Sequence, residues 1–133
     1  WKTVLTTLPK LTQLDANNKF RNDWDLVKQT GKKRLACLVE KKCGIKFNTD
    51  SIFDIQVKRI HEYKRQKLNV LHIMYLYNKL IKNPDLDMVP RTFIFAGKAA
   101  PGYYIAKQTI KLINTLADKV NNDKRIKDKL KVK

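Results

Sequence analysis

Apolar residues in the first third of the chain, positions 3–44, recur at helical spacing. A short helix, interrupted by Pro9, is predicted from four evenly spaced leucines: Leu5, Leu8, Leu11 and Leu14. A second helix is predicted over about residues 17–43, because its large apolar side chains fall mainly on one stripe: Phe20, Trp24, Val27, Leu35, Leu38 and Val39. Gly31 is a candidate break in this helix, and Gly44 stands where a C-terminal cap is expected.

The hydrophobic period changes after the polar turn residues 48–51. Partial alternation predicts a strand over residues 52–57, and the apolar pattern that follows predicts a long helix over residues 61–81. Asn83-Pro84-Asp85 ends that helix. The elements predicted after it are a strand over 93–96, a helix over about 103–121 and the start of a third strand within 129–133.

Strand, helix, strand and helix in this order are typical of an α/β fold with a parallel sheet and right-handed crossovers. We therefore expect two parts: a helical lead-in segment, residues 1–48, and a partial Rossmann-like α/β domain, residues 49–133. Two strands do not make a stable sheet, and the third begins only at the last residues. The expectation at this point is an internal fragment of a longer protein.

Positive charge dominates the composition. The chain has 29 Lys and Arg against 12 Asp and Glu, a formal net charge of +17. Such a balance is typical of a nucleic-acid or anion binder. The surplus is mostly Lys, spread along the whole chain without the interleaved aromatic residues that stack bases. A solvated lysine surface explains the charge equally well, and composition leaves both interpretations open.

Several classes of protein are disfavoured. No apolar run approaches the roughly 18 residues that span a bilayer, and the first residues lack a secretory pattern. Cys37 and Cys43 lie six positions apart, without a zinc-like arrangement of further Cys or His. We expect reduced thiols in a cytoplasmic protein that binds no metal.

The first candidate site is the basic segment 57–66, Val-Lys-Arg-Ile-His-Glu-Tyr-Lys-Arg-Gln, at the first strand-to-helix junction. Ligands of open α/β sheets bind beyond the carboxyl ends of the strands. Lysine, arginine and the free N–H groups of a helix N-terminus bind phosphate oxygens there. A dianionic ligand is one interpretation of this segment, and a solvated basic first helical turn is the other.

The second candidate is the segment 97–104, Gly-Lys-Ala-Ala-Pro-Gly-Tyr-Tyr, at the next strand-to-helix junction. Its small residues allow a close backbone approach to a ligand, although a plain tight turn has the same composition. His61 adjoins the basic segment, where it has either a functional role or a structural hydrogen bond. His72 is expected to be a core histidine. The cationic tail, residues 124–133, either binds an acidic partner or forms a solvated helix end and edge strand.

These two segments resemble hallmark sequences of the α-glucan phosphorylases, the glycogen, starch and maltodextrin phosphorylases. The first hallmark is matched by residues 51–66, Ser-Ile-Phe-Asp-Ile-Gln-Val-Lys-Arg-Ile-His-Glu-Tyr-Lys-Arg-Gln, and the second by residues 97–104 at about the family's spacing. Looser similarity extends over the leading helices, through Phe20, Trp24 and the run Lys33-Arg34-Leu35-Ala36. The chain is thereby identified as a member of this family.

The resemblance implies a homodimeric, pyridoxal 5'-phosphate-dependent glycosyltransferase of the B-type fold, in which two Rossmann-like halves face a cleft. Such enzymes transfer a terminal α-1,4-linked glucosyl unit to inorganic phosphate and release glucose 1-phosphate. By the same resemblance Lys58 contacts the cofactor's phosphate region, and Arg59 and Lys64 bind the substrate phosphate. Tyr63 hydrogen-bonds the glucosyl unit, and Tyr103 matches an aromatic residue that stacks inhibitors in some members.

One departure from the family limits what the chain is expected to do. The family's Schiff-base lysine lies in a Gly-Thr-Gly-Asn-Met-Lys segment, which has no match here. The chain by itself is therefore expected to be inactive. Separately, the resemblance to the phosphorylases leads us to expect that it binds neither nucleic acid nor a membrane. A basic nucleic-acid-binding module and a non-catalytic relic stay open as alternatives, and the sequence does not identify the preferred glucan.

Overall fold

The computed structural model describes residues 4–133; Thr3, the first residue of the predicted helical region, lies outside them. The chain forms two compact units, Trp1–Thr49 and Asp50–Lys133. The first unit is helical, and the second contains helices and a three-stranded sheet. The candidate site residues, Lys58, Arg59, Tyr63, Lys64 and Tyr103, all belong to the second unit.

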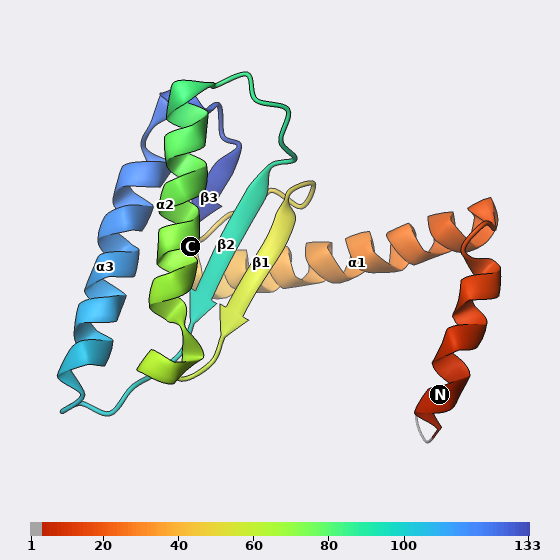
Figure 1. The fold of residues 1–133 in the computed structure, drawn as a ribbon, viewed down its shortest axis with the longest axis horizontal. Helices are drawn as coiled ribbons and strands as arrows, with labels where there is room; N and C mark the ends of the chain where they lie inside the picture. The colour runs from red at the N-terminus through yellow and green to blue at the C-terminus, as the bar shows by residue number, and fades with distance from the viewer. Residues whose placement is uncertain (1–3) are drawn as a thin grey trace. The chain divides into compact units, whose positions relative to one another are not determined.

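The first unit consists of a 3-10 helix, η1 (Leu5–Leu14), and a long α-helix, α1 (Asn18–Cys43) (Figure 1). Helix α1 begins at Asn17, whose side-chain oxygen accepts a hydrogen bond from the Phe20 N–H at 3.1 Å. It ends at Gly44, which has φ of 69° and donates its N–H to the Glu40 carbonyl. The predicted glycine cap is confirmed.

Neither predicted interruption of these helices occurs. Helix η1 continues through Pro9, whose carbonyl accepts a hydrogen bond from the Thr12 hydroxyl at 2.7 Å. The fixed φ of proline suits a helix, and the loss of one N–H donor does not end this exposed 3-10 segment. Helix α1 runs through Gly31 without a break. A glycine costs a helix about 1 kcal/mol relative to alanine, too little to end a helix of 26 residues.

The second unit is a parallel α/β arrangement in which strands and helices alternate. Its strands are β1 (Ile52–Val57), β2 (Arg91–Ala96) and β3 (Leu130–Val132), in the spatial order β1-β2-β3 with both pairs parallel. The connections are α2 (Gln66–Lys82) and α3 (Tyr104–Asn121), with short 3-10 turns η2 (Glu62–Lys64) and η3 (Lys124–Ile126) (Figure 1). The predicted elements are all present, and the α/β class is confirmed.

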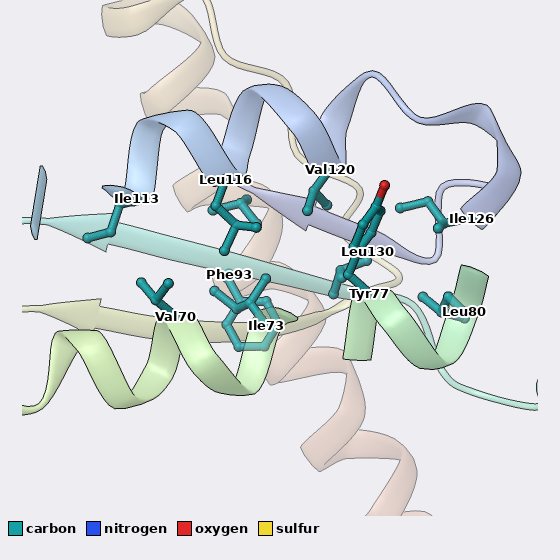
Figure 2. Close-up of a cluster of buried hydrophobic side chains, with 11 residues drawn as sticks. Val70, Ile73, Tyr77, Leu80, Phe93, Ile113, Leu116, Val120, Ile126 and Leu130 are labelled. Carbon is teal, nitrogen blue, oxygen red and sulfur yellow. The ribbon is translucent and has the colours of Figure 1, made fainter. Parts of the chain in front are cut away.

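One hydrophobic cluster joins both helices to the sheet. Figure 2 shows side chains of α2 and α3 pointing toward Phe93 of β2 and Leu130 of β3. The buried apolar side chains that α2 and α3 contribute are Val70, Ile73, Tyr77, Leu80, Ile113, Leu116 and Val120. Phe93 pairs in register with Val132, which is buried in the same cluster. Burying each such side chain contributes about 1.5–3 kcal/mol, so this cluster fixes the frame that carries the two candidate loops.

Polar contacts close the end of the unit opposite those loops. The Tyr77 hydroxyl donates to the Asp123 carboxylate at 2.6 Å, and the Arg125 guanidinium binds the same carboxylate at 2.7 Å. The Arg125 guanidinium and the Tyr77 hydroxyl both stabilise the Asp123 anion and lower the pKa of Asp123. The hydrogen bond to Asp123 and burial raise the pKa of Tyr77, and the nearby Arg125 opposes that rise. Lys129 donates to the carbonyl oxygens of Pro84 and Leu86.

The cationic tail therefore has internal partners for much of its charge. Arg125 binds Asp123, Lys127 binds Asp85 and Lys131 binds Asp128. The Lys127 ammonium lowers the pKa of Asp85. Residues Leu130–Val132 of this tail form strand β3, which pairs in parallel with β2 and so agrees with the prediction of a strand here.

The Asp123 contacts predict a specific pH dependence. A carboxylate whose pKa is lowered on folding stabilises the fold above its unfolded pKa of about 3.9, and that stabilisation is lost as the pH falls. Asp123→Asn should therefore lower the melting temperature of the chain at pH 7, and the gap from wild type should narrow toward pH 2.5 in thermal melts. Asp118→Asn, a change of an exposed carboxylate on α3, is the control. An equal gap at both pH values would contradict the prediction.

Other sequence expectations concern cysteines, metals and membranes. Cys37 and Cys43 are both free thiols, as predicted, and both are exposed. Within residues 4–133, no group of three or more His, Cys, Asp or Glu side chains is arranged to hold a metal ion. Every helix of that described range is too short or too polar to cross a bilayer.

Candidate functional site

The two predicted loops leave the sheet at one edge and side by side. Val57 and Ala96, the last residues of β1 and β2, are register partners. Backbone pairing continues beyond the strands: the Lys58 N–H donates to the Ala96 carbonyl at 3.0 Å, and the Ile60 N–H donates to the Lys98 carbonyl at 3.1 Å. The segments 58–65 and 97–103 therefore form one surface at the carboxyl ends of the strands, where α/β proteins bind ligands.

Gly97 permits this close approach. A Cβ atom at this position would lie 2.2 Å from the Lys58 carbonyl oxygen and 3.3 Å from the Ile60 side chain. The group that approaches Gly97 is the backbone of the neighbouring loop, and the predicted approach to a ligand stays a prediction. At Gly102 an added Cβ would meet nothing within 4 Å.

The cations of the first loop do not lie in the first turn of a helix, contrary to the sequence prediction. Helix α2 begins only at Gln66, and residues 62–64 form the separate 3-10 turn η2. The two are separated by Arg65, whose φ of 62° and ψ of 30° are left-handed and incompatible with a continuous helix. Lys58 and Arg59 precede η2 and are exposed, whereas Lys64 ends it and is half-buried.

Positive charge on this loop is not neutralised locally. Within the described part of the chain, residues 4–133, Lys58, Arg59 and Lys64 form no ion pair with a carboxylate. The neighbouring carboxylate, Glu62, lies 4.0 Å from the Lys67 ammonium and accepts a hydrogen bond from the Tyr103 hydroxyl at 3.3 Å. The loop cations are thus available to an anionic ligand, as expected for a phosphate site.

Arg59 faces a pocket shared with the second loop. This open pocket has a volume of about 230 Å³ and is lined by Arg59, Lys98, Ala99 and Ala100. The side chains of Arg59 and Lys98 border this space together with two alanines. The sequence singled out both loops but did not predict that Arg59 and Lys98 would line one pocket.

The aromatic side chains of the two loops cluster beside the cations. The His61 ring lies 4.3 Å from the Tyr63 ring and 5.1 Å from the Tyr103 ring, between centroids. The Lys64 ammonium lies 5.6 Å from the Tyr63 ring centroid. Tyr63 is 70% exposed, so its hydroxyl and ring face outward. The structure thus brings Tyr63, Lys64 and Tyr103 together around His61.

His72 is not the core histidine that its apolar helix predicts. Its side chain is exposed, and its ring meets the buried Phe93 ring edge-on at a centroid distance of 5.8 Å. It lies one residue before Ile73, which is fully buried, so the helical period turns it toward the rim of the core. No role in the candidate site follows from this position.

Three side-chain amides support the first loop. Gln66 ends the predicted segment 57–66 but had no role predicted for it, and Gln56 and Asn69 lie outside that segment. Gln66 is buried, and its amide bonds to the backbone on both sides of Ile60. Gln56 of β1 donates to the Lys64 carbonyl, and Asn69 of α2 donates to Gln56. The available signal was a polar Gln within the strand pattern and another at the start of the apolar helix.

Comparison with known proteins gives consistent matches over the full length. A family model described as carbohydrate phosphorylase matches residues 1–133. The chain is 52% identical over 132 residues to a glycogen phosphorylase from Synechocystis. This alignment covers 99% of this chain and 16% of that relative. Identity is 48% to the Haemophilus influenzae glycogen phosphorylase and 48% to the sheep brain form, covering 99% and 98% of this chain and 16% and 15% of those relatives. The chain spans about one sixth of the length of these relatives.

Proposed function

Since this chain belongs to the carbohydrate phosphorylase family, we propose that it supplies anion-binding residues to an α-glucan phosphorylase. The proposed reaction transfers a terminal α-1,4-linked glucosyl unit to inorganic phosphate and releases glucose 1-phosphate. Membership in this family does not support the alternative of a nucleic-acid-binding module. The proposed partners are therefore phosphate and a glucan, within a cytoplasmic homodimer of the glycosyltransferase B-type fold.

The observation that carries this proposal is the unpaired positive charge at the carboxyl edge of the sheet. Lys58, Arg59 and Lys64 lie on one loop without a carboxylate partner among the described residues, and Lys98 joins Arg59 at one pocket. Two phosphate groups held together repel by about 4 kcal/mol per pair of unit charges at 4 Å and intermediate dielectric. Fixed cations offset that repulsion before any proton moves between them, which is electrostatic preorganisation.

The same donors fit the phosphate group of pyridoxal 5'-phosphate. Lys58 is exposed at the sheet edge, and the loop offers ammonium and guanidinium groups, which suit a dianion. We assign Lys58 to the cofactor's phosphate, and Arg59 and Lys64 to the substrate phosphate. When bound, the cofactor would supply a phosphate group that exchanges a proton with the substrate phosphate.

The aromatic cluster suits the sugar side of the proposed site. Tyr63 has an exposed ring and hydroxyl next to the loop cations, so we assign it a hydrogen bond to the glucosyl unit. Tyr103 is half-buried, and its hydroxyl is held by Glu62, which leaves its ring as the contact surface. Stacking of a flat inhibitor is the role proposed for Tyr103.

Arg59→Ala tests the proposal in a full-length enzyme, made by replacing the matching segment of the Synechocystis relative with this chain. Loss of a charge-assisted contact of about 1.5–3 kcal/mol should raise the KM for phosphate about 10- to 100-fold. The KM for maltodextrin should stay within about twofold of the unsubstituted enzyme, because Arg59 is assigned to phosphate alone. Initial rates of glucose 1-phosphate release measure both constants.

The matched control is Lys111→Ala, which removes an exposed cation from α3 away from both loops. It should leave both KM values unchanged. An unchanged KM for phosphate in Arg59→Ala would remove the role assigned to Arg59. An equal rise in both variants would mean that overall positive charge, and not the loop, attracts phosphate.

A further inference from the structure

The backbone next to Arg59 is held by a buried side chain. Gln66 is 1% exposed, and its amide nitrogen donates to the Arg59 carbonyl at 3.1 Å. Its amide oxygen accepts from the His61 N–H at 3.4 Å. Ile60, between these two residues, is buried and donates its N–H to the Lys98 carbonyl. Arg59 is therefore carried by a backbone segment that is fixed from the helix, from the core and from the second loop.

A second amide pair holds the backbone next to Lys64. The Gln56 amide nitrogen donates to the Lys64 carbonyl at 3.0 Å. The Asn69 amide nitrogen donates to the Gln56 oxygen at 3.1 Å, which fixes the orientation of the Gln56 side chain. The Lys64 N–H also donates to the His61 carbonyl at 3.0 Å, within the turn. Lys64 is thus fixed from strand β1 and from helix α2.

These bonds restrain a turn that is strained. Arg65 has φ of 62° and directly follows Lys64. A left-handed conformation costs a residue with a side chain roughly 1–2 kcal/mol, and it persists where the surroundings impose it. Apolar residues would fill the space of Gln66 at lower desolvation cost, because a buried amide is costly unless it is hydrogen-bonded. The amide bonds end on the carbonyls of Arg59 and Lys64, two residues whose side chains are assigned to phosphate.

We propose that Gln66 and the Gln56–Asn69 pair are positioning residues for phosphate binding, which set the spacing between Arg59 and Lys64. This inference rests on the function proposed above. Errors of about 1 Å in the placement of a binding group cost large factors in rate, so a supporting layer of hydrogen bonds has a direct effect on the reaction. Gln66 touches no substrate in this arrangement and acts only through the backbone of residues 59–61.

The test uses the same full-length enzyme with Gln66→Met, which keeps the length of the side chain and removes both hydrogen bonds. We expect the KM for phosphate to rise about tenfold, the equivalent of one to two lost hydrogen bonds, while the KM for maltodextrin stays within about twofold. Gln108→Met, a change of an exposed glutamine on α3, is the control and should change neither constant. Equal effects on both KM values would indicate a merely structural role and overturn the proposal.

Gln66→Glu gives an independent readout. A carboxyl group at this position donates to the Arg59 carbonyl only when it is protonated, whereas wild-type glutamine donates at every pH. Burial raises the pKa of a carboxyl group at this position above its ordinary value of about 4.3, so that group loses its proton as the pH rises from 5 to 8. The ratio of the KM for phosphate, variant over wild type, should therefore be larger at pH 8 than at pH 5. A ratio that does not change with pH would overturn the proposal, even where Gln66→Met fails to fold.

The outcome also separates this inference from the proposed function. If Arg59→Ala raises the KM for phosphate and Gln66→Met does not, the positioning role is wrong and the phosphate site stands. If Arg59→Ala leaves that constant unchanged, the phosphate assignment itself fails, whatever Gln66→Met does.

Discussion

Gly97→Ala is expected to destabilise the chain and to remove most phosphorolysis from the full-length enzyme described above. The added Cβ would lie 2.2 Å from the Lys58 carbonyl oxygen and 3.1 Å from the Lys58 carbonyl carbon, so the backbone has to move. Overpacking of this kind costs about 1–3 kcal/mol. The shift separates the two loops where the Lys58 and Ile60 N–H groups pair with Ala96 and Lys98. A displacement near 1 Å at that edge corresponds to about a 100-fold loss of rate.

Gly102→Ala is the matched control, because it makes the same change in the same loop. An added Cβ there meets nothing within 4 Å, and Gly102 does not have a positive φ. Its urea midpoint and activity should stay close to those of wild type, or rise slightly because alanine restricts the unfolded chain. Equal behaviour of the two variants, in urea unfolding and in initial rates, would show that the approach of the loops is not what requires glycine at position 97.

The order and type of the helices and strands were predictable because they depend on the spacing of apolar residues along the chain. Alternating residues in 52–57 and the apolar runs that follow gave the strands and helices of the α/β unit in the right sequence. The long helix α1 was also predicted, with the correct glycine cap at Gly44. Pro9 and Gly31 predict interruptions, yet the helices continue through both, because a single weak position is outweighed by its neighbours.

The predicted start of α2, residue 61, was wrong, and tertiary contacts explain why the helix begins at Gln66. Residues 61–65 carry side chains compatible with a helix, so no local signal excluded one. Helix α2 begins instead at Gln66, where the amide bonds of Gln66 and Gln56 hold the preceding turn and Arg65 adopts a left-handed conformation. The side chains that hold this turn come from strand β1 and helix α2. The spacing of apolar residues along the chain carries no information about such contacts.

The candidate site was also predictable in part: its two segments are visible in the sequence, but their arrangement in space is not. Its two segments were found from chemistry at the strand ends, because cations after β1 and small residues after β2 are visible in the sequence. Their mutual geometry was not predictable. The sharing of one pocket by Arg59 and Lys98 and the tilted contact between the His61 and Tyr103 rings depend on the parallel register of β1 and β2. The charge surplus was ambiguous for a similar reason, since the internal partners of Arg125 and Lys127 become visible only in the fold.

Leu80→Ala should cost the chain about 2–5 kcal/mol in its free energy of unfolding, measured in urea. Leu80 is 0% exposed at the C-terminal end of α2 and belongs to the same buried cluster as Phe93 and Leu130 (Figure 2). Removing its isopropyl group leaves a cavity that the helix cannot close without separating from the sheet. Because a domain of this size has only about 5–15 kcal/mol of stability, one such change unfolds a measurable fraction of the molecules.

Leu71→Ala makes the same substitution in the same helix and isolates the burial term. Leu71 is 60% exposed, nine positions before Leu80, so its truncation should change the free energy of unfolding by less than about 0.5 kcal/mol. The helix propensities of leucine and alanine are similar and cancel between the two variants. If the two truncations cost the same, α2 would be packed through a different face, and the N-terminal turn that orients Arg59 and Lys64 would have to be placed anew.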